Sequence, residues 1–429
     1  MEINPIVLSI PVYFILIGIE LLYDRIKHKK LYRLNDAFTN ISCGIFQQTT
    51  GVFSKVATVA VYHFVFTHFS LFEIPQTWYW AVVLFIGVDF FYYWAHRMDH
   101  EVNLLWLGHV VHHQSEDYNF SVALRQGAFQ QIFNIVFMLP LAILGFETSW
   151  FVYIGAFTTL YQFWIHTETI DQLPKWFEYI FNTPSHHRVH HGRNPKYIDK
   201  NHGGTFIIFD RLFGTFQKEE EKPTYGVTSP TATFDPVGAH IKPIRDLWKD
   251  WQLVPSYADK FKLLFMPPGW LPDSLGGQRT PPDITPENKV KFEVQVPFAW
   301  NVYIITQFII TLVATAYFLF NYNQFNLLAT LGTFGMITFS IVSLGKILEQ
   351  KKQAFWLELI RWAIVLVGSA FILPEPLQNR IFISLAATIT AMLIWIAYLF
   401  QLKDKTLFPA KHEQIQQPVS DSFSDHYHS

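Results

Sequence analysis

Histidines provide the chemistry that this sequence offers most clearly. The chain has 18 histidines, and 11 of them lie within residues 96–202. Three clusters share close spacing: HRMDH at 96–100, HVVHH at 109–113 and HRVHH at 187–191. Spacings of three and four residues place imidazoles on one face of a helix. Because neutral imidazole is the commonest protein ligand for zinc, copper and iron, the clusters predict a metal site.

The number of clustered histidines predicts two metal ions, because one ion takes only about four to six ligands. The predicted ligands are the eight clustered histidines and the lone His166, namely His96, His100, His109, His112, His113, His166, His187, His190 and His191. His186 and His202 are further candidates, although a helix would direct His186 about 100° away from His187. Isolated histidines such as His63 and His240 are expected to pack between helices.

The size of the ligand set favours redox chemistry over hydrolysis. Zinc hydrolases usually keep three protein ligands and one open position, so nine histidines exceed what that chemistry needs. Two neighbouring redox-active iron ions suit the activation of O2 and the abstraction of hydrogen from a C–H bond. The sequence therefore indicates a di-iron oxidase or oxygenase.

Carboxylates near the clusters could orient the ligand imidazoles from behind, as they commonly do at metal sites. The candidates are Asp89, Asp99, Glu101, Glu116, Asp117, Glu168 and Asp199. Asp89 lies within an apolar stretch, where an unpaired charge is costly. We therefore expect Asp89 to contact a histidine or Arg97.

The composition predicts that membrane helices position these residues. Half of the residues are hydrophobic and only 15% are charged, against roughly 25% in soluble domains. The net charge of −2 and the absence of a basic run argue against a nucleic-acid partner. The single cysteine, Cys43, excludes an internal disulfide and a cysteine-based metal site.

Nine apolar stretches approach the roughly 20 residues that a helix needs to cross a bilayer. The predicted spans are 5–23, 45–68, 77–95, 127–145, 148–165, 296–320, 326–345, 354–373 and 380–402. The first lacks the basic start and cleavage site of a signal peptide, so we expect it to be retained. The expected fold class is an all-α, polytopic integral membrane protein.

The distribution of Lys and Arg predicts the orientation in the membrane. Five basic residues follow the first span, at 25–33, whereas the loops near 69–76, 146–147 and 321–325 have none. The histidine clusters are therefore expected on the cytoplasmic side, in the endoplasmic reticulum of a eukaryote or the cytoplasmic membrane of a bacterium. The expected divisions are N-terminal helices (1–74), a catalytic region (75–217), a cytoplasmic connection (218–295), C-terminal helices (296–405) and a disordered tail (406–429).

The order HxxxH, HxxHH, a lone histidine and HxxHH resembles the fatty acid hydroxylase and sterol desaturase superfamily of membrane di-iron enzymes, over residues 75–217. Within it, the runs HRMDHE at 96–101, HHQSEDYN at 112–119, ALRQ at 123–126, QFWIHTE at 162–168 and TPSHHRVHHGRN at 183–194 are most similar to the alkylglycerol monooxygenase family. The resemblance implies two iron ions held by the nine histidines, and a functional role for Glu101.

The resemblance also implies a reaction. O2 would hydroxylate the carbon next to the ether oxygen of an alkylglycerol, and the product would collapse to an aldehyde and a glycerol derivative. Tetrahydrobiopterin would be the external reductant, and the chain has no dinucleotide or haem motif to replace it. One position departs from the family pattern, since Asn201-His202-Gly203 stands where Asn-Tyr-Gly is expected.

Two alternatives stay open at the level of sequence. One is another di-iron lipid oxidation, such as sterol or fatty acyl hydroxylation or desaturation. The other is a membrane metal transporter or sensor, although transport would predict ionisable residues along several spans. The expected partners are a lipid substrate, O2, an external electron donor and the membrane, with the oligomeric state open.

Overall fold

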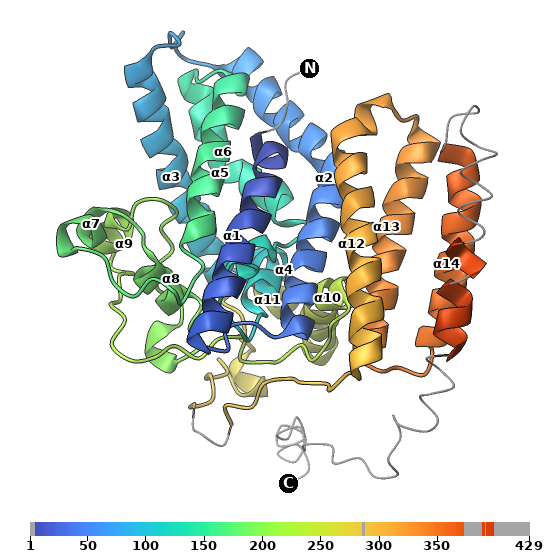
Figure 1. The fold of residues 1–429 in the computed structure, drawn as a ribbon. Helices are drawn as coiled ribbons and strands as arrows, with labels where there is room; N and C mark the ends of the chain where they lie inside the picture. The colour runs from blue at the N-terminus through green and yellow to red at the C-terminus, as the bar shows by residue number, and fades with distance from the viewer. Residues whose placement is uncertain (1–4, 285–287, 373–387, 391, 399–429) are drawn as a thin grey trace.

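The computed structural model describes residues 5–284, 288–372, 388–390 and 392–398. Residues 5–284 and 288–372 form 14 α-helices and short 3-10 turns, residues 388–390 and 392–398 are also helical, and no described residue belongs to a β-strand. Figure 1 shows long helices standing side by side, with short helices gathered around their lower half. The all-helical fold class expected from the sequence is confirmed for the described residues.

The N-terminal half is a bundle of five longer helices. They are α1 (Pro5–Lys27), α2 (Leu34–Phe69), α3 (Trp78–Glu101), α5 (Gln130–Leu144) and α6 (Thr148–Trp164). Helix α3 packs against both α5 and α6, while α2 packs along α5 and α1 packs on α6. Tyr62, Leu84 and Leu141 are buried at the centre of the α2, α3 and α5 contact. The helices that carry the clustered histidines lie near the lower ends of this bundle (Figure 1).

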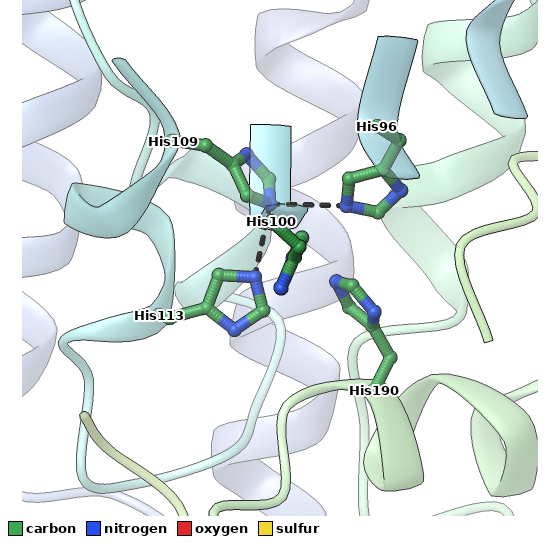
Figure 2. A group of neighbouring side chains, drawn as sticks. All are labelled: His96, His100, His109, His113 and His190. Atoms are coloured by element: carbon green, nitrogen blue, oxygen red, sulfur yellow. Dashed lines mark hydrogen bonds between the residues drawn. The ribbon is translucent and has the colours of Figure 1, made fainter. Parts of the chain in front are cut away.

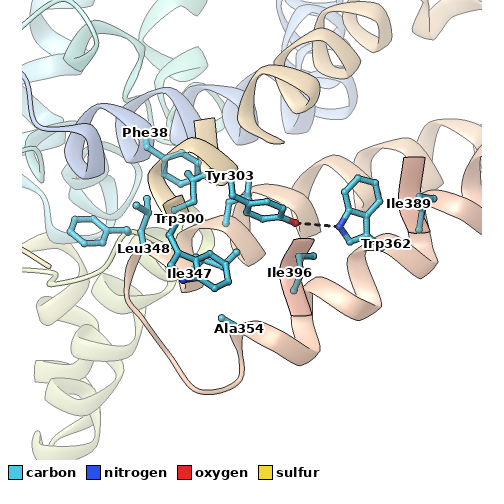
Figure 3. Close-up of a cluster of buried hydrophobic side chains, with 12 residues drawn as sticks. Phe38, Trp300, Tyr303, Ile347, Leu348, Ala354, Trp362, Ile389 and Ile396 are labelled. Atoms are coloured by element: carbon cyan, nitrogen blue, oxygen red, sulfur yellow. Dashed lines mark hydrogen bonds between the residues drawn. The ribbon is translucent and has the colours of Figure 1, made fainter. Parts of the chain in front are cut away.

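Three further helices stand beside the bundle. They are α12 (Phe298–Asn321), α13 (Leu327–Leu348) and α14 (Ala354–Ile372). Helices α12 and α13 pack on α2, and α13 packs on α14. Figure 3 shows the shared core, in which Phe38 of α2 meets Trp300 and Leu348. Apolar burial therefore joins the C-terminal helices to the histidine-bearing half.

Four described helices are long and apolar enough to cross a membrane: 34–69, 78–101, 298–324 and 327–348. They coincide with four of the predicted spans, and the chain is a multi-pass membrane protein. The predicted spans near 5–23, 127–145, 148–165 and 354–373 are helices too, although α5 and α6 have only 15 and 17 residues. The span expected at 380–402 and the tail fall largely outside the described residues. Nine crossings stay a prediction.

Helix α2 begins 11 residues earlier than the predicted span at 45–68. Its first turns carry the polar residues Asn35, Asp36 and Asn40, which are buried. Asn40 donates hydrogen bonds to the carboxylate of Asp36 (3.0 Å) and to the hydroxyl of Ser121 (3.0 Å). Hydropathy missed this part because its polar side chains face protein rather than lipid.

The connection predicted at 218–295 contains two helices, α10 (Pro236–Leu253) and α11 (Tyr257–Phe265). Each begins at a capping side chain: Asp235 accepts a hydrogen bond from the Val237 amide (3.0 Å), and Ser256 accepts one from the Asp259 amide (3.4 Å). Both helices pack on the short helix α4 (Asn103–His113). The segment therefore supports the histidine region directly.

A buried ion pair joins the C-terminal helices. Arg361 donates to Glu358 at 2.7 Å, and both side chains are almost fully buried. Tyr303 of α12 and Ser343 of α13 each donate to the Glu358 carboxylate at 2.5 Å. Trp362 donates to the Tyr303 hydroxyl at 3.3 Å (Figure 3). The network links three helices through one carboxylate.

We expect Arg361→Met to destabilise these helices by about 3 kcal/mol, because Glu358 would keep a buried charge without its cation. The double variant Glu358→Gln/Arg361→Met should lose less, since no charge is left unpaired. Denaturation of the purified protein in detergent, followed by tryptophan fluorescence, measures both. A double variant less stable than Arg361→Met would contradict the assignment.

Candidate metal centre

The first two histidine clusters lie on α3 and α4, two helices joined by a sharp reversal of the chain at Val102. His96 and His100 lie in the last turns of α3, and Val102 then adopts an extended conformation (φ −123°, ψ 117°). Helix α4 starts immediately afterwards and packs back on α3. This reversal turns His109 and His113 toward the two α3 histidines, as Figure 2 shows.

The remaining histidines come from two further segments. His166 stands just beyond the end of α6. Helix α8 (Pro184–His190) starts with proline at its first turn, which suits the fixed φ of that residue. It presents His187 and His190, and His191 caps its C-terminal end. Histidines as far apart in the sequence as His96 and His191 thus meet at one end of the bundle.

The structure gathers all nine predicted histidines into two adjacent groups, each able to hold a metal ion. In each group, one nitrogen per residue lies within 4.8 Å of every other. The first group is His96, His100, His109, His113 and His190, and the second is His112, His166, His187 and His191. All nine side chains are buried.

Each HxxHH cluster contributes to both groups. His109 and His113 join the first group, while His112, on another side of α4, joins the second. In α8 the division is reversed, since His190 joins the first group and His187 and His191 join the second. Two short helices therefore bridge the groups, and rings from both lie close together: His113 and His191 stack with centroids 4.5 Å apart.

Main-chain carbonyls fix how several rings face inward. Nδ1 of His96 lies 2.7 Å from the carbonyl oxygen of His202, and Nδ1 of His112 lies 2.7 Å from that of Arg125. His166 and His190 make the same contact at 2.7 Å and 3.0 Å with other carbonyls. A carbonyl can only accept, so Nδ1 carries the proton and the Nε2 lone pair is free.

Two of the predicted carboxylates stand behind the rings. The amide nitrogen of Gln130 donates to Asp99 at 2.9 Å and lies 2.9 Å from Nδ1 of His109. Asp199 lies 3.4 Å from Nδ1 of His100. A carboxylate that faces Nδ1, as Asp199 does at His100, orients a metal-binding imidazole and raises its basicity. Asp99 reaches His109 only through the Gln130 side chain, which helps to hold the ring in place. Glu116 and Asp117 instead form ion pairs with Arg33.

The donor set fits metal ions. Nε2 atoms of His100, His190 and His191 are buried and have no hydrogen-bond partner, an arrangement that is costly unless something binds them. Nε2 of His109 lies 3.0 Å from Nε2 of His96 and 2.9 Å from that of His113. Burial lowers the pKa of His112 to about 4 and that of His191 well below its usual value. Neutral rings with converging nitrogens are suited to bind metal.

Comparison with known proteins agrees with this geometry. Residues 81–215 match the fatty acid hydroxylase family model. The chain is 40% identical to alkylglycerol monooxygenase of Xenopus tropicalis over 362 residues, which cover 82% of this chain and 79% of that protein. It is 38% identical to the human alkylglycerol monooxygenase over 364 residues, covering 83% and 80%. The chain belongs to the alkylglycerol monooxygenase family.

A further relative is similar to only part of the chain. Ornithine lipid hydroxylase OlsE of Rhizobium tropici is 32% identical over 169 residues, which cover 38% of this chain and 49% of that protein. No solved structure matches the chain. The similarity over most of the chain is therefore to alkylglycerol monooxygenases.

Three predicted site residues of this family member lie outside both groups. His186 lies 3.3 Å from the hydroxyl of Thr183, with its ring against Phe216. Glu101 pairs with Arg97 at 2.8 Å and is partly exposed. His202 is fully buried beside the first group without being counted among its five histidines.

The expectation that Asp89 would contact a histidine or Arg97 is wrong. Its two oxygens accept hydrogen bonds from the amides of Thr205 (2.7 Å) and Phe206 (2.8 Å). Main-chain amides satisfy this buried carboxylate, so no cation is needed. Asp89 thereby ties α3 to the segment that supplies the carbonyl facing His96.

Sequence reasoning missed Arg125 and Gln130. The Arg125 guanidinium donates to the carbonyl of Val111 (2.7 Å) and to the side chain of Gln114 (2.8 Å), which fixes the loop whose carbonyl faces His112. Gln130 stands at the start of α5 behind His109. Neither residue has a spacing that signals such a role, because both act on histidines across gaps in the sequence.

Proposed function

We propose that this protein is a di-iron monooxygenase that cleaves the ether bond of alkylglycerols. The supporting observation is the pair of adjacent histidine groups, one of five histidines and one of four, which are buried where membrane helices end. A ligand set this large and rich in nitrogen favours two redox-active ions over a hydrolytic zinc site. Relatives matched over four fifths of the chain carry the alkylglycerol monooxygenase name.

The proposed reaction balances with one O2 and two electrons. One oxygen atom hydroxylates the carbon next to the ether oxygen, and the other leaves as water with two protons. The resulting hemiacetal breaks its bond to the ether oxygen, releasing an aldehyde and a glycerol derivative. Bound iron would supply the activation of O2.

The protein's own residues would hold the two metal ions and exclude water from them. Nine imidazoles would hold the two ions, with carbonyls and Gln130 keeping their rings in place. Burial of every ring separates the reaction from bulk water. We also propose that the histidines lie at the cytoplasmic ends of the membrane helices. A lipid chain could enter there between the helices, while the reductant arrives from water.

We propose tetrahydrobiopterin as the electron donor. The support is the resemblance to the alkylglycerol monooxygenase family, whose members take electrons from this pterin, and the lack of a dinucleotide or haem motif in the sequence. The polar cavity beside the histidines, lined by Gln114, Arg125, Asp36 and Glu116, measures only about 30 Å³ and is too small for a pterin. The pterin would therefore have to bind elsewhere on the protein.

The test is turnover of 1-O-alkylglycerol by the purified, iron-loaded protein with O2 and tetrahydrobiopterin. We expect fatty aldehyde to appear in step with O2 uptake. A His113→Ala variant serves as the inactive control. Absence of aldehyde, together with oxidation of a sterol or acyl lipid, would refute ether cleavage.

A second candidate is hydroxylation of another membrane lipid without ether cleavage. The similarity to an ornithine lipid hydroxylase across the histidine region favours it. Including an ornithine lipid in the same assay separates the candidates, because its product would be a stable hydroxylated lipid and no aldehyde would form.

Glu101 is proposed to act through Arg97 as a positioning residue. The ion pair spans one turn at the end of α3, and Arg97 also donates to the Tyr93 hydroxyl at 3.2 Å. We expect Glu101→Gln to retain both metal ions and to lower kcat by about tenfold, within the range typical of outer contacts. Metal analysis with steady-state kinetics measures this. Loss of a metal ion would instead make Glu101 a ligand.

A further inference from the structure

His202 lies among the rings of the first histidine group. Its ring centroid is 5.1 Å from that of His100, 5.6 Å from His96 and 5.7 Å from His190. Members of the group are spaced similarly, for example 5.4 Å between His96 and His100. His202 therefore places a sixth imidazole ring beside the five rings of the first group.

The main chain holds His202 firmly in this place. Its amide donates to the carboxylate of Asp210 at 2.8 Å, and its carbonyl oxygen lies 2.7 Å from Nδ1 of His96. Asp210 also accepts from the Gly203 amide at 2.8 Å and the Thr215 hydroxyl at 2.7 Å. The ring's position beside the first group is therefore set by a fixed backbone.

The ring itself lacks hydrogen bonds. His202 is 0% exposed, and neither of its ring nitrogens makes a hydrogen bond of normal geometry. The carbonyl of Asp199 approaches the ring without making such a bond. Burying an imidazole with both nitrogens unpaired is costly. This side chain therefore indicates a ligand that would lie beside it.

The five histidines of the first group would leave one position open on an ion that takes six ligands. The nitrogens of His202 do not meet the 4.8 Å spacing that the five histidines share, so the structure does not place its ring in the ligand set. We propose that His202 hydrogen-bonds to the small ligand, such as water, that fills this sixth position. The proposal rests on the proposed function, because it requires the metal centre. It makes His202 the residue that controls which small ligand binds at the remaining coordination position.

Azide binding to the purified, iron-loaded protein tests this role without relying on turnover. Azide is a small anion that replaces a water ligand, and its absorption band reports binding. The variants are His202→Phe, which keeps a ring without N–H groups, and His202→Gln, which keeps a donor. His186→Gln, buried nearby but outside both groups, is the matched control.

We expect His202→Phe to retain two iron ions per chain and to weaken azide binding about tenfold, as expected for one lost hydrogen bond. His202→Gln and the control should stay within about threefold of the unmodified protein. Unchanged azide binding in His202→Phe would overturn the proposal and assign the ring to packing. Loss of one iron ion would overturn it by making His202 a ligand.

The outcomes also separate this proposal from the proposed function. An unmodified protein that holds two iron ions and binds azide but releases no aldehyde would refute ether cleavage alone. Variants that lose azide binding in parallel with general unfolding are identified by circular dichroism, and His202→Gln then decides the result. Weak binding in a folded His202→Gln protein would contradict the hydrogen-bond role.

Discussion

His187→Ala should abolish turnover and release about one of the two metal ions, while His186→Gln, one residue earlier, should keep both ions. His187 belongs to the second histidine group, and its Nε2 lies 3.0 Å from that of His166. The His186 ring faces Phe216 instead. The two substitutions change neighbouring residues of the same short helix, and only one removes a proposed ligand.

The expected loss in kcat/KM for His187→Ala exceeds about 100-fold, because altering even the outer contacts of a metal ligand costs about 10- to 100-fold. His186→Gln should stay within about tenfold, since it keeps a polar side chain near Thr183. Metal content by elemental analysis and aldehyde release are measured on both. Equal loss of metal in the two variants would contradict the division of the α8 histidines.

Helical spacing predicted the eight clustered histidines, and the position of the lone His166 added the ninth, but neither predicted how the nine divide. Spacing places His109, His112 and His113 near one face of a helix. The division depends on α4 folding back at Val102 and on α8 arriving from beyond residue 183. These are long-range contacts, and no local pattern encodes them. The sequence could therefore predict two ions without assigning a ligand set to each.

Hydropathy was similarly informative within limits. It located α3, α12 and α13 because their sides are apolar along most of a span. It missed the first turns of α2, whose polar side chains are buried, and it missed α10, which is amphipathic and buried only near its N-terminal end. Asp89 shows the same limit for charge, because main-chain amides rather than a cation satisfy it.

Removing the metal ions should destabilise the whole histidine region. Without metal, buried nitrogens such as Nε2 of His100 and His190 lack partners. Each tightly bound ion contributes about 4 kcal/mol when free metal exceeds its Kd a thousandfold. Chelation should therefore lower Tm by at least roughly 10 °C, measured in detergent by tryptophan fluorescence. Restoring ferrous iron should reverse the shift.

The control for chelation is the double variant His113→Ala/His187→Ala, which removes one histidine from each group. The Tm of this variant should already be low, because each metal site has lost a histidine and binds its ion weakly. A chelator should therefore lower the Tm of the variant little further. A chelator shift as large as that of the unmodified protein would mean that the stabilising metal lies elsewhere. A small shift would tie this part of the stability to the imidazoles that α3, α4, α8 and the end of α6 bring together, because the ions would cross-link these separate segments.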